Sequence, residues 1–200
     1  MIRSLFILSL IFLLSCTEER REVPVSNIGE LRQIMHQGAF QARVNLDTLV
    51  QEGTFGLGAL DSLSGEVLVL NGTVYRSEII GDSLVSTVNT LTNATLFVYS
   101  SVNSWDTISA SGISDLENLL VKKSSESGLA EPFPFIVLGK PNLTYHVINF
   151  DPINGDFSKH KEGSYTSTLS DTDALILGFY STIAKGVYTH HDSNMHLHVI

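Results

Sequence analysis

The sequence predicts an α+β fold, in which an N-terminal mixed sheet with helices precedes a strand-rich, antiparallel C-terminal part. Apolar residues at helical spacing occur in residues 28–37 and again in residues 114–123. Short apolar runs bounded by turn residues are typical of strands, and they dominate the chain after Glu131. The last run ends at Ile200 in mid-strand, so we expect the fold to be truncated there. We therefore predict an N-terminal α/β domain at residues 26–130 and an incomplete strand-rich domain at residues 131–200.

Composition and charge narrow the class of protein. Of the 200 residues, 43% are apolar, which is enough to build a sizeable core. The formal net charge is −9. An acidic chain has no general attraction for nucleic acid or for anionic lipid headgroups, so nucleic acid is excluded as an expected partner.

The first sixteen residues are typical of a bacterial lipoprotein signal peptide. Arg3 precedes an apolar run from Leu5 to Leu14, which is too short for a transmembrane helix. Ser15 and Cys16 complete a sequence similar to a lipobox, and Cys16 is the only cysteine. We predict lipidation at Cys16, a tether at residues 17–25, and an exported protein whose only membrane contact is its lipid anchor. An ordinary secretory signal with an incidental cysteine is the alternative.

Three helices are predicted in the N-terminal domain. Asn27 and Glu30 have the spacing of a capping box before a helix that ends at Gly38. Residues 45–53 predict a short helix closed by a glycine. A third helix is predicted to begin at the Ser114–Glu117 spacing.

Strands are predicted at six places before the final histidine run. Residues 67–70 and 73–77 flank Asn71-Gly72, which is a strong signal for a two-residue hairpin. Residues 94–99, 132–138 and 174–180 are apolar runs of strand length. We also expect residues 143–150 to pair with residues 132–138 across the turn at 139–142.

Two histidines near the end of the chain have the spacing of a metal site. His196 and His198 are two residues apart in a run with Leu197, Val199 and Ile200, so on a strand their imidazoles point to the same face. Two neutral imidazoles on one face are half of a zinc or iron site. Two histidines on a solvated strand face remain the alternative. The other strand histidine, His146, is predicted to be structural or solvated.

Glu66 is the carboxylate with the most interesting position. It follows Gly65 and opens an apolar strand beside the tight hairpin. A carboxyl group at the mouth of a buried strand can take part in proton transfer. On local sequence alone, a solvated charge at the start of a strand explains it better.

Two separated segments resemble the α-acetolactate decarboxylase family. Residues 53–75 match the family's glycine-rich turn, its Gly-Glu pair at Gly65 and Glu66, and its hairpin with a tyrosine. Residues 178–200 look like its Gly-Phe, Gly-Val and His-Leu-His segment, which contains His196 and His198. The resemblance implies the decarboxylation of α-acetolactate, a small 2-hydroxy-3-keto acid, to acetoin and CO2. It also implies a zinc cofactor held by the two histidines, Glu66 facing the metal, and a homodimer.

The match also has departures. The family's third histidine ligand and its second catalytic glutamate would lie past Ile200. Ala59 stands where the family has a threonine, and Lys140 is the nearest cation to the place of an absent pocket arginine. Ala59 and Lys140 are therefore candidate substrate-pocket residues. Two other functions remain open, namely a cupin-type metalloenzyme, which also uses His-x-His, and a non-catalytic ligand-binding surface lipoprotein on the same scaffold.

Overall fold

The structure is a computed structural model that describes residues 20–89, 91–110, 115–150 and 163–200. The predicted signal peptide, its lipidation site Cys16 and the first part of the tether lie outside these ranges, as does Ser114. Among the described residues, no helix has the length and apolar character needed to span a bilayer.

The N-terminal part forms a seven-stranded antiparallel sheet. The strand order is β1-β7-β3-β4-β5-β6, and β2 pairs with β7 at its side. The bounds are β1 Val25–Ile28, β2 Val44–Asn45, β3 Thr54–Leu60, β4 Gly65–Leu70, β5 Thr73–Ile80, β6 Ser83–Val88 and β7 Asn93–Ser101. The predicted hairpin is confirmed, because Asn71 and Gly72 join β4 to β5 with φ of 48° and 82°. The mixed sheet is not confirmed: tight turns join β4 to β5 and β5 to β6, and only antiparallel strands can be joined in this way.

The C-terminal part is strand-rich and antiparallel, as predicted, although its pairing differs. It contains a three-stranded sheet in the order β12-β11-β8 and a separate β9-β10 pair. The bounds are β8 Phe133–Gly139, β9 Leu143–Val147, β10 Tyr165–Leu169, β11 Ala174–Tyr180 and β12 Met195–Val199. The predicted pairing of residues 143–150 with 132–138 is wrong. Strand β8 pairs instead with β11, where Phe133 stacks on its cross-strand partner Tyr180 at 5.2 Å between ring centroids.

The helices are shorter or begin elsewhere than predicted. Helix α1 (Leu31–Gln37) ends at Gly38 with φ of 63°, which confirms that boundary. The capping box is wrong, because Asn27 lies in β1 and its side chain donates to the carbonyl of Gly29. Residues 45–53 contain only a 3₁₀ turn at Leu46–Thr48. Helix α2 (Leu116–Glu126) is capped by Asp115, whose carboxylate accepts the Asn118 N–H.

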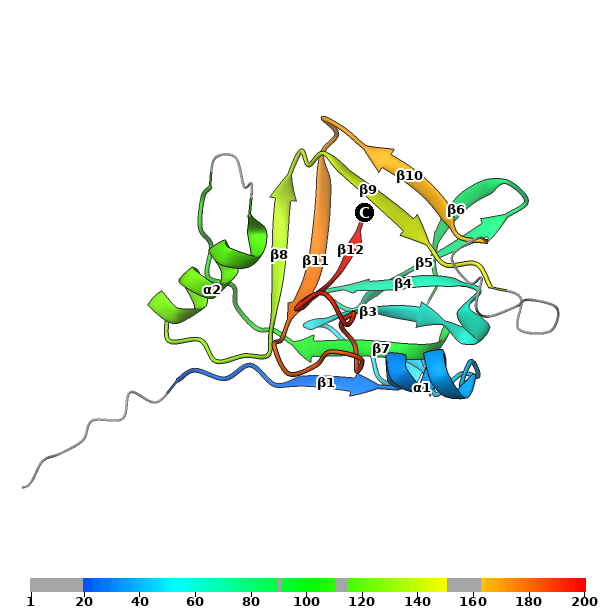
Figure 1. The fold of residues 1–200 in the computed structure, drawn as a ribbon, viewed down its shortest axis with the longest axis horizontal. Coiled ribbons are helices and arrows are strands. Elements are labelled where there is room, and N and C mark those ends of the chain that lie inside the picture. Colours follow the sequence, from blue (N-terminus) through cyan, green and yellow to red (C-terminus); the bar gives the residue numbers. More distant parts are fainter. Residues whose placement is uncertain (1–19, 90, 111–114, 151–162) are drawn as a thin grey trace, which may run out of the picture.

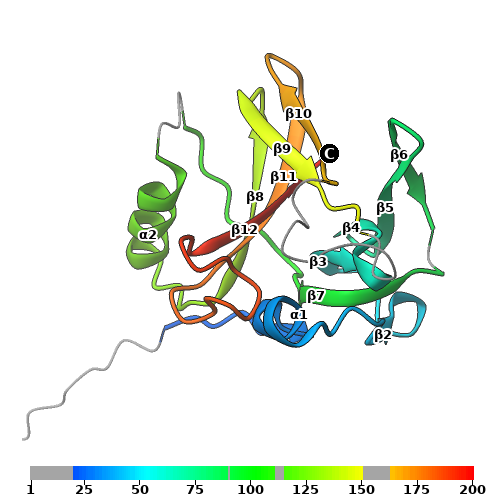
Figure 2. The same cartoon turned by 45° about the vertical axis from the view of Figure 1, so that its right-hand side comes forward.

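A shared core holds the two sheets together. Leu57 of β3 and Val98 of β7 pack with Leu177 and Phe179 of β11 in one buried cluster. This contact sets β11 against the large sheet and brings its neighbour β12 next to β4, as the two views in Figures 1 and 2 show. Strand β9 lies against β5 on the same side. The arrangement leaves a space where β4, β5, β9 and β12 approach one another.

Candidate active site

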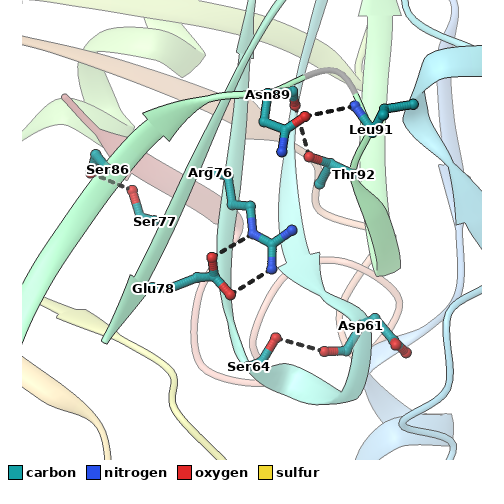
Figure 3. Close-up of polar contacts among 9 residues, drawn as sticks. All are labelled: Asp61, Ser64, Arg76, Ser77, Glu78, Ser86, Asn89, Leu91 and Thr92. Atoms are coloured by element: carbon teal, nitrogen blue, oxygen red, sulfur yellow. Dashed lines mark hydrogen bonds and ion pairs between the residues drawn. The ribbon is translucent and has the colours of Figure 1, made fainter. Parts of the chain in front are cut away.

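A pocket of about 210 Å³ lies between the large sheet and the two C-terminal strand groups. One wall comes from β4, β5 and β6, and the others come from β9, β10 and β12. Its polar lining includes Glu66, His198, His146 and a pair of serines. The hydroxyls of these serines, Ser77 and Ser86, are 2.8 Å apart across adjacent strands (Figure 3).

Gly65 places Glu66 at the pocket. A Cβ atom at Gly65 would lie 2.2 Å from the carbonyl oxygen of Ser77, so only glycine allows β4 to begin this close to β5. Glu66 then pairs with Ser77 on one side and with Ala59 on the other. Its Oε1 atom accepts a long hydrogen bond of 3.4 Å from the N–H of Ile148, just after β9.

His198 connects the last strand to β4. Its Nδ1 atom lies 3.0 Å from the carbonyl oxygen of Val67, and its Nε2 atom lies 3.4 Å from Oε2 of Glu66. A carbonyl oxygen can only accept, so Nδ1 carries the proton and the lone pair of a neutral imidazole is on Nε2. This is the arrangement found in metal-binding histidines, where a backbone carbonyl fixes the tautomer and the ring orientation.

His196 lies on the same face of β12, as predicted. Its ring centroid is 5.0 Å from that of His198 and 6.2 Å from that of His190. The Nδ1 atom of His196 is buried and has no hydrogen-bond partner of normal length among the described residues. Burial lowers the pKa of this ring, and the backbone of Tyr188 raises it by a smaller amount. Buried polar atoms in proteins are nearly always paired, so a nitrogen without a partner of normal length suits a ligand.

Burial keeps the site uncharged. It raises the pKa of Glu66 to about 8, against a smaller lowering by the Ile148 hydrogen bond. It also lowers the pKa of His198 to about 4 and holds the pKa of His196 well below its usual range, with the neighbouring histidines adding to the effect. Near neutral pH the carboxyl therefore holds a proton that it can donate toward Nε2 of His198.

The raised pKa of Glu66 predicts how stability depends on pH in the metal-free protein. Between pH 4.5 and 8 the unfolded chain has released this proton and the folded chain has not, so stability falls as the pH rises. Gln cannot ionise. We expect Glu66→Gln to gain stability relative to the parent by on the order of 3 kcal/mol between pH 5 and pH 8.

Urea unfolding in a chelating buffer at several pH values measures this difference. The lowered histidine pKa values act in the opposite direction between pH 4 and 6.5, but both proteins share them, so they cancel in the comparison. A stability difference that stays constant with pH would contradict the prediction.

Glu66 and His198 meet at the pocket, whereas His196 lies beside His198 but is not among the described residues that line it. The other two candidates do not line the pocket either. Ala59 is buried in an apolar cluster with Leu96 and Phe150, and the segment after β9 covers it. Lys140 is half-exposed in the turn after β8, where its Nζ lies 3.9 Å from Asp171.

His146 is the residue whose position the sequence did not reveal. It was predicted to be structural or solvated, and it lies exposed on β9 in the wall of the pocket. No local pattern marks it, because its position depends on β9 lying against the large sheet.

Together, the fold and the site define a sheet-rich α+β protein with a largely buried carboxyl–imidazole pair between two sheets. A family model described as alpha-acetolactate decarboxylase matches residues 27–200, and the chain belongs to this family, as the sequence resemblance predicted. No curated protein sequence matches it.

Two solved structures share the fold. One is alpha-acetolactate decarboxylase from Bacillus subtilis strain 168, with 18% sequence identity and a TM-score of 0.68 over 90% of this chain and 75% of that one. The other is a protein of unknown function similar to alpha-acetolactate decarboxylase from Staphylococcus aureus. It has 14% identity and a TM-score of 0.62, over 88% of this chain and 74% of that one.

Proposed function

We propose that this protein decarboxylates α-acetolactate to acetoin and CO2 with the help of zinc. The observation that carries the proposal is the 3.4 Å approach of the Glu66 carboxyl to Nε2 of His198 in a pocket, in a chain of the α-acetolactate decarboxylase family. The two groups are far apart in the sequence, and their meeting is the feature that the chemistry requires.

The donor atoms present suit zinc in kind. Imidazole nitrogens are standard zinc ligands, and His198 has the carbonyl partner that a ligating histidine usually has. The unpaired Nδ1 of His196 is a second donor. As the side chains lie, no group of three or more His, Cys, Asp or Glu within the described ranges is arranged to hold a metal ion. His196 and His198 would hold the zinc, and Glu66 would face it.

Each part of the reaction has a residue suited to it. Zinc, when bound, would act as a Lewis acid toward the substrate oxygens on which negative charge develops. When the bond to CO2 breaks, its electron pair stays on the substrate. One proton must then be added at the carbon that carried the carboxylate. Glu66 is protonated near neutral pH in the metal-free protein and lies at the pocket, so it is the proposed proton donor.

One observation favours a second candidate, a non-catalytic ligand-binding lipoprotein. No Lys or Arg is found among the described residues that line the pocket, so the charge usually expected opposite an anionic substrate is missing. For either candidate we propose export and a lipid anchor at Cys16, and a homodimer as the family resemblance implies.

Acetoin formation from racemic α-acetolactate tests the function. The purified protein, loaded with zinc, should form acetoin well above the rate of spontaneous decarboxylation in a protein-free blank. Treatment with a chelator should remove the excess rate, and added zinc should restore it. Binding of α-acetolactate without acetoin formation would contradict the enzymatic proposal and support the ligand-binding one.

A further inference from the structure

The pocket offers few groups that can bind the carboxylate of an acid. Apart from tyrosines, the titratable side chains among its described lining residues are Glu66, His146 and His198. Glu66 repels a carboxylate once it is ionised. His198 already uses Nδ1 for the carbonyl of Val67 and turns Nε2 toward Glu66. That leaves His146 as the uncommitted nitrogen donor.

His146 occupies the part of the wall where an acid group would be tolerated. It lies on β9 opposite Thr166 of β10, and it is exposed, so an anion beside it keeps part of its hydration. Its imidazole makes no hydrogen bond within the described part of the chain. It lines the same pocket as Glu66 and His198, so an anion bound to it would lie beside the site.

The neutral groups nearby are less suited to this task. The hydroxyls of Ser77 and Ser86 are bonded to each other at 2.8 Å (Figure 3). An imidazole N–H can donate to a carboxylate in either protonation state of the ring. The hydrogen bond is stronger when the ring is protonated, because charge then assists it. No Lys or Arg among the described lining residues competes for the anion.

We propose that His146 binds the carboxylate of the substrate and thereby turns the hydroxyl and keto oxygens toward His198. The proposal rests on the proposed function, because it identifies the side chain that holds the acid group of that substrate. With the carboxylate at the exposed wall, the departing CO2 would face solvent, and the carbon that receives the proton would face the interior where Glu66 lies.

Binding of an unreactive acid tests the proposal without turnover. 2,3-Dihydroxy-2-methylbutanoate keeps the carboxylate but lacks the keto group that permits loss of CO2, whereas acetoin lacks the carboxylate. In calorimetric titrations of zinc-loaded protein, His146→Gln should bind the acid roughly 10- to 100-fold more weakly than the parent and bind acetoin equally well. His146→Arg should retain the affinity for the acid. His36→Gln, at an exposed histidine in the last turn of α1, is the matched control and should change neither affinity.

The outcomes separate the two proposals. Acid binding that depends on His146, in a parent that forms no acetoin, would support this inference and contradict the enzymatic function. An active parent whose His146→Gln variant binds the acid unchanged would overturn this inference and leave the function intact. Absence of acid binding by the parent would also overturn it. In assays of acetoin formation, His146→Gln should have a higher KM for α-acetolactate than the parent and nearly the same kcat.

Discussion

Glu66→Gln is expected to lower kcat for acetoin formation by roughly 10²- to 10⁴-fold, the usual contribution of a positioned proton donor. Gln has nearly the same size and can still accept the N–H of Ile148, but it has no acidic proton to give. The loss should therefore appear in kcat at saturating zinc, where metal occupancy is equal in both proteins. Acetoin formation measured against the protein-free blank gives this number.

Glu78→Gln is the matched control for that measurement. Glu78 lies on the neighbouring strand β5 and forms a bidentate ion pair with Arg76 (Figure 3), and it is not among the described residues that line the pocket. It should change kcat little. A Glu66→Gln enzyme with the parent's kcat would show that the proton comes from another group and would remove Glu66 from the reaction.

His198→Ala is expected to weaken zinc binding by at least about 100-fold. Removing a residue that only hydrogen-bonds to a metal ligand lowers metal affinity by up to about 100-fold, and removing the ligand itself should lower it more. The same change removes the hydrogen bond from Nδ1 to Val67, so some of the loss could come from looser docking of β12. His196→Ala separates the two effects, since no described residue of β4 makes a hydrogen bond with its imidazole, whose backbone contact is with Tyr188.

Zinc titration against a competing chelator measures both variants, with thermal unfolding of the metal-free proteins alongside. We expect both to lose zinc and only His198→Ala to lose stability through the missing bond to β4. Zinc affinity equal to the parent in both variants would contradict the assignment of these histidines as ligands.

Local patterns in the sequence predicted the elements that local physics determines. Asn71 and Gly72 adopt positive φ, which these two residue types tolerate better than others. Two residues were therefore enough to predict the hairpin. The two histidines of β12 share a face because a strand has a period of two, and this too requires no distant partner.

The rest of the fold and site depends on contacts between distant residues. Strand β8 pairs with β11, which is distant in the sequence. The turn residues at 139–142 favoured pairing with the next strand and did not indicate this distant partner. For the same reason the sequence could not show that Ala59 is covered by the segment after β9, or that His146 lines the pocket. The proximity of Glu66 to the histidines was expected from family resemblance and not from any spacing.

The bond between Val67 and His198 joins residues 131 positions apart. Nothing resembling the site exists until the last strand has reached its place, so metal uptake should lag behind formation of the large sheet and follow completion of the native state. Once captured, the ion would shift the folding equilibrium in favour of that state by mass action. The same coupling would make release of a bound zinc ion a sensitive early reporter of local opening at the C-terminal edge.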